Sequence, residues 1–171
     1  MTWNDFHRRQ HAIRAVLDHA AADPAAPLRP ELVPAAAEVF ADRAELLRAL
    51  QHKWNRGLLG RIDVAAEDAD ADPRGDRVEA VGAAWRRAVE ANPVLRQVLD
   101  AHAADPAIAG LVRRERGVVA VSAGLAEADE PAAELDRIGS AFLRLLDTAP
   151  PTETRRRRNP LHQLRRLMPS F

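Results

Sequence analysis

Apolar side chains recur along this chain at the spacing of an α-helix, while the alternating patterns that mark β-strands are nearly absent. The strongest stripe follows Asp42, and its members recur every three or four positions at Leu46, Leu47, Leu50, Trp54, Leu58 and Ile62. A helix with one apolar face has to bury that face against a neighbour. The sequence therefore predicts an all-α protein built as a helical bundle.

Helix caps and prolines divide the chain into segments. Asp42 is a favoured N-cap, and Glu45 completes the pattern for a helix that we expect to continue to about Asp70. Proline is tolerated in a first helical turn, so three further starts are expected at Asn92-Pro93, Asp105-Pro106 and Glu130-Pro131. These signals predict a short helix after Asn92 and helices over 4–22, 34–40, 42–70, 76–91, 106–124 and 131–148.

Charge is unevenly distributed along the chain, although the formal net charge is zero. Residues 1–150 carry 19 basic and 24 acidic side chains, whereas residues 151–171 carry six arginines and one glutamate. Such asymmetry is typical of a basic tail that binds an anion. We therefore expect a short helical head over 1–41, a helical body over 42–149 and a basic amphipathic tail over 150–171.

The expected tail combines two kinds of residue. Its arginines can neutralise phosphates or carboxylates, and they are Arg155, Arg156, Arg157, Arg158, Arg165 and Arg166. Apolar residues at helical spacing then form a face suited to docking on a partner, namely Leu161, Leu164, Leu167 and Phe171. A solvated basic tail without a docking role is the alternative interpretation.

No arrangement of residues indicates catalysis. The sequence has no cysteine, no glycine-rich phosphate loop and no serine nucleophile motif, and its carboxylates cluster where solvated acids are expected. We therefore expect a protein that is not an enzyme and has no cofactor or metal site. Two tryptophans on neighbouring helices either pack in the core or line a pocket for an apolar small molecule. The predicted pocket residues are Trp54, Leu58, Trp85 and Val89.

The segment from Val39 to Leu47 resembles the junction between the DNA-binding head and the ligand-binding body of tetracycline-repressor-type (TetR-type) regulators. Phe40 and Leu46 match the family pattern, and Asp42-Arg43 is a conservative variant of its cap and basic residue. The order of the expected helices over 46–149 is similar to that of the family body. The Ala-Gly-Val-Ser motif of the family's helix-turn-helix is not found upstream, so the head is reduced.

This resemblance implies a regulator of transcription or an adaptor that binds a small molecule or a partner in its body. It also implies a homodimer joined through the helices near 106–124 and 131–148, and it places Arg43 at the family's phosphate-contacting position. A cytoplasmic location is expected, since no apolar run is long enough to cross a bilayer. The alternative function is that of an unrelated helical interaction protein whose basic tail binds nucleic acid, an anionic membrane or an acidic protein.

Removal of residues 150–171 is expected to leave the melting temperature nearly unchanged, because Pro150-Pro151 ends the preceding helix and the arginines need external partners. It should also weaken binding to any polyanion, since six arginines contribute to counterion release. Calorimetry and a binding assay at several salt concentrations measure the two effects. A much lower melting temperature for the truncated protein would show that the tail packs on the core.

Overall fold

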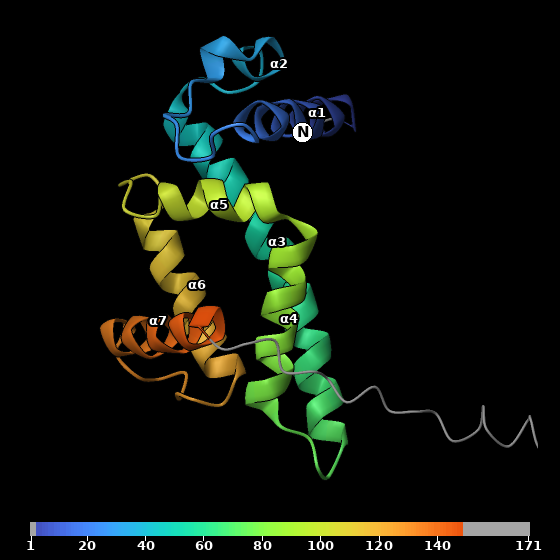
Figure 1. Cartoon of the computed structure of the whole chain (residues 1–171), viewed down its shortest axis with the longest axis vertical. Helices are drawn as coiled ribbons and strands as arrows, with labels where there is room; N and C mark the ends of the chain where they lie inside the picture. Colours follow the sequence, from blue (N-terminus) through green and yellow to red (C-terminus); the bar gives the residue numbers. More distant parts are fainter. Residues whose placement is uncertain (1–2, 149–171) are drawn as a thin grey trace, which may run out of the picture.

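The structure, a computed structural model, describes residues 3–148 and is all-α over this range, which confirms the predicted fold class (Figure 1). Its elements are α1 (Trp3–Ala20), a short 3-10 helix η1 (Pro30–Leu32), α2 (Pro34–Ala37), α3 (Arg43–Ala71), α4 (Arg77–Ala91), α5 (Pro93–Ala101), α6 (Ala109–Ser122) and α7 (Ala132–Thr148). Helix α3 forms the long axis of the fold. Helices α1 and α2 lie at its N-terminal end, and the turn into α4 lies at its other end.

Helices α3 and α4 each begin at an aspartate cap, and the cap of α3, Asp42, is the one that the sequence predicts. The backbone N–H of Glu45 donates to Asp42 Oδ1 at 2.7 Å, and Glu45 Oε2 in turn accepts from the N–H of Ala41 at 2.9 Å. Asp76 caps α4 in the same way, accepting from the N–H of Glu79 at 3.1 Å. Each cap satisfies N–H groups that a helix start leaves unpaired. The caps therefore fix the residue at which each helix begins.

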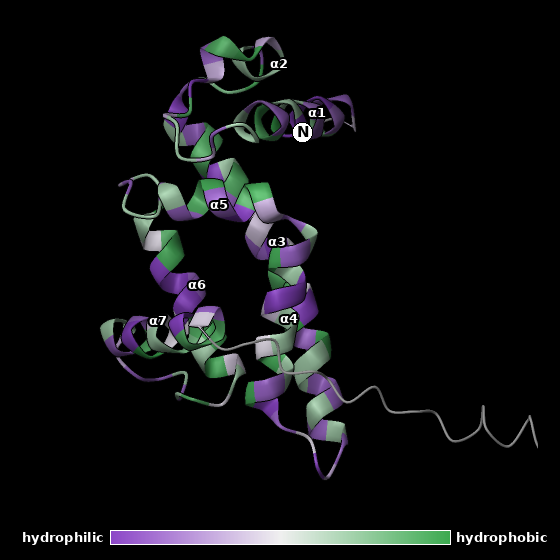
Figure 2. Cartoon of the chain, viewed as in Figure 1, coloured by the Kyte–Doolittle hydropathy of each residue, from purple (hydrophilic) through white to green (hydrophobic). Residues whose placement is uncertain are grey.

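A single apolar core connects all the helices. Helix α3 buries its whole predicted stripe, and burial of a large apolar side chain contributes about 1.5–3 kcal/mol. Figure 2 shows hydrophobic and hydrophilic residues alternating around the helices, as expected when each helix buries one face. Buried residues of the other helices join the same core, among them Ile13, Val16, Val81, Leu99, Val112 and Phe142.

The segment between α1 and α3 contains little regular structure. Residues 24–41 hold only η1, with three residues, and α2, with four. A helix that reads DNA has to extend along the major groove, and neither of these is long enough. The segment therefore does not form the helix pair of a helix-turn-helix head. Its irregularity agrees with the four prolines that fall within it, Pro24, Pro27, Pro30 and Pro34.

Several boundaries differ from the prediction. Helix α6 begins at Ala109 and not directly after Asp105, because Asp105 first forms a turn in which its Oδ1 accepts from the N–H of Ala107 at 2.8 Å. Helices α1 and α2 also end slightly earlier than expected. Phe6 of α1 and Leu145 of α7 are large apolar residues whose side chains are exposed.

The crossing of α6 and α7 depends on two glycines. A Cβ atom at Gly139 would lie 2.0 Å from the carbonyl oxygen of Arg116, so the two backbones touch there. A Cβ atom at Gly117 would lie 3.2 Å from the Cβ of Leu135. The chain then turns from α6 toward α7 at Gly124, whose φ of 70° favours glycine. Helices α6 and α7 therefore form one closely packed pair.

Replacement of Gly139 by Ala is expected to lower the free energy of unfolding by about 1–3 kcal/mol, because the added methyl group forces the α6 and α7 backbones apart. Gly60→Ala is the matched control. A Cβ atom there meets nothing within 4 Å, so the change should be neutral or stabilise α3 by up to about 1 kcal/mol. Denaturant titration of both variants makes the comparison. Equal stability of the two variants would contradict the close crossing.

Candidate functional site

Three polar side chains lie inside the bundle where α3, α5 and α6 meet. They are Gln51, Arg96 and Glu115, and each exposes at most 7% of its surface. Arg96 Nη1 donates to Glu115 Oε1 at 3.1 Å, and the Gln51 amide donates to the other oxygen of that carboxylate. Arg96 also binds both carboxylate oxygens of Asp100. Both oxygens of Glu115 therefore have a donor, as a buried carboxylate requires.

Two tryptophan rings cover the buried arginine. Trp54 of α3 and Trp85 of α4 meet edge to face, with their centroids 5.5 Å apart. The guanidinium carbon of Arg96 lies 5.0 Å from the Trp54 centroid and 5.4 Å from the Trp85 centroid. Such cation–π contacts contribute about 0.5–2 kcal/mol each. The two rings therefore pack against each other in the core around a cation, and Trp85 also lines a cavity.

The surroundings shift the pKa values of both charged groups. Burial raises the pKa of the Glu115 carboxyl, and the nearby Arg96, Trp54 and Gln51 oppose that rise. Burial alone would lower the pKa of Arg96, but its bonds to Asp100 and the charge of Glu115 raise it instead. The Trp54 Nε1–H is buried and lies near enough to Glu115 to lower the pKa of its carboxyl, but it makes no well-formed hydrogen bond. The Gln51 Oε1 is buried without a donor, so the cluster has one acceptor to spare.

A cavity of about 380 Å³ lies beside this cluster, between α4, α5, α6 and α7. Trp85, Val89, Val112 and Leu143 form an apolar wall, and Arg96 and Glu115 belong to the opposite, polar part of the lining. The charges of the whole lining balance, because it contains the three cations Arg96, Arg116 and Arg144 and the three anions Asp100, Glu115 and Asp147. Such a lining suits a small molecule with an apolar part, hydrogen-bonding groups and no net charge.

The structure divides the predicted pocket residues between two places. Trp85 and Val89 line the cavity beside Arg96, whereas Trp54 and Leu58 line a separate hollow of about 310 Å³ on α3. Trp54 and Leu58 are almost fully buried, so they contribute mainly to the core. The four residues are neighbours, but these hollows do not unite them around one ligand.

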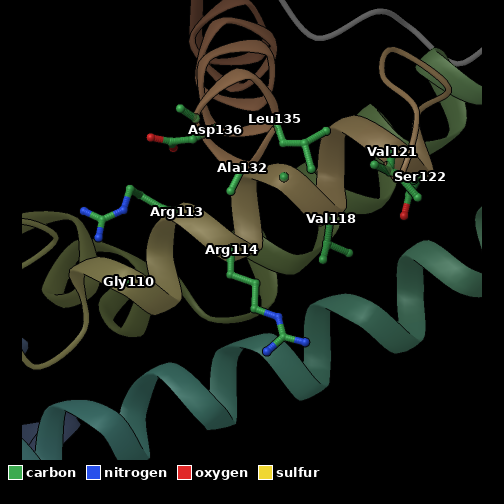
Figure 3. Close-up of a pocket in the computed structure, with 12 residues that line it drawn as sticks. Gly110, Arg113, Arg114, Val118, Val121, Ser122, Ala132, Leu135 and Asp136 are labelled. Atoms are coloured by element: carbon green, nitrogen blue, oxygen red, sulfur yellow. The ribbon is translucent and has the colours of Figure 1, made fainter. Parts of the chain in front are cut away.

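A second candidate site is a groove of about 710 Å³ along α6 and the first turns of α7 (Figure 3). Apolar and small residues form most of its lining, including Gly117, Val118, Val121, Ala132 and Leu135. Gly117 allows Leu135 of α7 to approach α6 closely at the groove, because a Cβ atom at Gly117 would lie 3.2 Å from the Cβ of Leu135. An apolar groove of this size on a surface is a common feature of binding and assembly sites.

The groove has opposite charges at its two ends. Arg113 and Arg114 extend from the first turns of α6 (Figure 3), and neither forms an ion pair with another described residue. Asp136 of α7 also lines the groove, and its carboxylate is paired with Arg116 at 3.3 Å. At the other end, Ala128 belongs to the α6–α7 loop, which carries the acidic residues Glu127 and Asp129. The groove is therefore apolar along its middle, basic at the start of α6 and acidic beyond its end.

The remaining predicted site residues lie elsewhere or outside the described chain. Arg43 forms an ion pair with Asp105 and approaches His102 Nδ1 at 3.5 Å, so its guanidinium holds the α5–α6 loop against the start of α3. The predicted anion-binding and docking residues of the tail are Arg155, Arg156, Arg157, Arg158, Arg165, Arg166, Leu161, Leu164, Leu167 and Phe171, and they lie outside the described residues.

Sequence reasoning missed Arg96 and Glu115, although a signal was available. Glu115 falls three residues after Val112 and four before Val119, which is an apolar position of the α6 stripe. Arg96 likewise follows the buried Leu95 in α5. A charged residue on a buried stripe requires a partner, and two such residues of opposite charge predict an ion pair.

Comparison with known protein families, with curated proteins and with solved structures found no match to this chain. The resemblance to TetR-type regulators therefore stays a prediction. Within residues 3–148, no helix combines the length and the apolar character that crossing a membrane requires.

Replacement of Glu115 by Ala is expected to lower the free energy of unfolding by about 3 kcal/mol, because it leaves the buried Arg96 with Asp100 alone and the Gln51 amide without its acceptor. The double variant R96M/E115L removes both charges and should lose less stability than E115A. Denaturant titration measures both variants. A double variant less stable than E115A would contradict the ion-pair account.

Proposed function

We propose that the protein is a homodimeric regulatory or adaptor protein of the helical class, without enzymatic activity, whose subunits join through the α6–α7 face. The supporting observation is the groove along α6, which has an apolar middle and oppositely charged ends. A surface of this kind is self-complementary. It fits the two-fold symmetry of most homodimers, in which the same patch of each subunit contacts its counterpart.

The charges at the ends of the groove specify how two copies would dock. Arg113 and Arg114 lie near the start of α6, and Glu127 and Asp129 follow in the loop after α6 ends at Ser122. If two α6 helices lie antiparallel, the basic end of each meets the acidic end of the other. Val118 and Leu135 then lie near the two-fold axis, where apolar residues form the centre of an interface.

Helix α6 also connects the proposed interface with the cavity beside the buried arginine. Val112, Glu115 and Arg116 line the cavity, while Arg113, Arg114 and Val118 of the same helix line the groove. A small molecule in the cavity would thus touch the helix that joins the subunits. Coupling between two sites requires such a shared element, and this supports a regulatory role for a ligand of the body.

The proposal does not include base-specific reading of DNA by a helix-turn-helix. Residues 24–41 have no helix of suitable length, and Arg43 is already paired with Asp105. A TetR-like regulatory body with a reduced head is compatible with this arrangement. Its output would be transmitted through a protein partner or through the basic tail.

The proposed dimer predicts the behaviour of two charge-reversal variants. R113E/R114E makes both ends of the groove acidic, and E127R/D129R makes both ends basic, so each variant should be monomeric at micromolar concentration. A mixture of the two variants should again dimerise, because every contact then joins opposite charges. Sedimentation velocity of the wild type, of each variant and of the mixture measures this.

An apolar substitution pair provides the control. Val118→Glu places a charge in the middle of the groove and should dissociate the dimer, whereas Val64→Glu changes a valine that is 59% exposed on α3 and should leave it intact. Circular dichroism checks that all variants stay folded. A wild type that sediments only as a monomer, or a V118E variant that remains dimeric, would contradict the proposal.

A further inference from the structure

Two hollows on the face formed by α1 and α3 share one residue, Lys53. The first, of about 370 Å³, lies between these helices and is lined on the α1 side by His7, His11 and Arg14. The second, of about 310 Å³, continues along α3 from Lys53 past Arg56 toward the end of α4. Because Lys53 lines both, the two hollows form one continuous surface across α3.

The cations of this surface have no acidic partner. Arg14, Lys53 and Arg56 form no ion pair with any described residue. Arg61, which also lines the second hollow, donates to the carbonyl oxygen of Gly57 at 2.7 Å. Asp18 is the one carboxylate among the residues that line the two hollows. The surface is therefore positively charged, whereas residues 1–150 as a whole carry more acidic than basic side chains.

Exposed aromatic rings lie at one end of this surface. Trp3 is 76% exposed, and its ring centroid lies 4.3 Å from that of His7. The ring of Phe6, also exposed, lies 5.7 Å from the same imidazole. Positions 3, 7, 11 and 14 fall on one stripe of α1, so the exposed tryptophan and Arg14 lie on the same side of the helix. Trp3 and Phe6 thus place two exposed aromatic rings beside His7, on the same helix as Arg14.

We propose that the α1–α3 face, made of Trp3, His7, Arg14, Lys53 and Arg56, binds single-stranded nucleic acid. The three cations contact successive phosphates across α3, and bases stack on the Trp3 ring beyond them. A basic groove combined with exposed aromatic rings is the usual construction of sites that bind single strands without base specificity. This site is separate from the tail and from Arg43, and it does not depend on the proposed dimer.

Two other polyanionic partners fit the surface less well. A duplex offers phosphates but keeps its bases paired, so Trp3 would have nothing to stack on. An anionic membrane requires a helix with a wide apolar face, and α1 exposes only Trp3 and Phe6 as large apolar residues. The combination of unpaired cations with exposed rings therefore favours a single strand.

Binding of a fluorescein-labelled oligothymidylate of about 12 nucleotides, within the usual size of such sites, tests the proposal with the full chain. The variant R14Q/K53Q/R56Q is expected to bind about tenfold more weakly at moderate salt. The slope of log affinity against log salt concentration should fall by about 2, since each phosphate contact on a single strand contributes about 0.7. Fluorescence anisotropy measures both quantities.

The control variant R29Q/R74Q/R87Q removes the same charge from exposed positions outside the two hollows. The tail is present in both variants, so its contribution is the same in each. The control should keep the wild-type affinity and slope within about twofold. If the two variants weaken equally, or if neither weakens binding, the affinity comes from net charge or from the tail, and the proposed site is wrong.

Trp3 provides a second readout that charge alone cannot produce. The protein has three tryptophans, and Trp54 and Trp85 are buried, so quenching by an unlabelled oligothymidylate should come from Trp3. The quenching should disappear in Trp3→Phe while the melting temperature stays unchanged. A duplex with the same number of phosphates should compete less well than the single strand. Unquenched Trp3 fluorescence at saturation, or stronger binding to the duplex, would overturn the proposal.

Discussion

The ion pair between Arg96 and Glu115 lies in the interior of the bundle, and the arrangement of four helices depends on it. Moving a charged side chain out of water costs several kcal/mol, so the pair is tolerated only where other groups surround it. Gln51 and Trp54 come from α3, Trp85 from α4, Arg96 from α5 and Glu115 from α6. These contacts form only when each of the four helices has one particular rotation about its axis and one particular position along it. The polar contacts therefore favour one packing of the helices over the many that apolar contacts alone would allow.

Helix α6 occupies the central place between the buried cluster and the outer surface. One side carries Glu115 into the cluster and lines the neighbouring cavity, and the other side lines the apolar groove. The backbone contact at Gly139 holds α7 directly against α6. A ligand that displaced α6 from the cavity side would also displace the residues of α6 and α7 that line the groove, because a closely packed helix pair moves as a unit. The proposed ligand site and the proposed dimer interface are mechanically linked for this reason.

Net charge is a poor guide to the partners of this protein, because local arrangement decides the field that a partner meets. The chain is neutral overall, and seven of the 18 arginines in residues 3–148 form an ion pair with a carboxylate. Two groups of cations without an ion pair line hollows of the surface. Arg113 and Arg114 stand at one end of the α6 groove, and Arg14, Lys53 and Arg56 stand along the α1–α3 face. Each group is free to meet an external partner, and the two groups belong to different surfaces.

The sequence by itself determined the helices and most of the core. Caps such as Asp42 act on their own first turn, and the spacing of Leu50, Trp54 and Leu58 makes one face apolar whatever the neighbours are. The tertiary structure decided which faces meet, because that depends on the angles and distances at which helices cross. The pairing of Arg96 with Glu115, the backbone contact at Gly139 and the exposure of Trp3 and Leu145 all arise at this level. None of them follows from local spacing. The ion pair and the backbone contact each link two separate helices, and a side chain is exposed when no other helix packs against it.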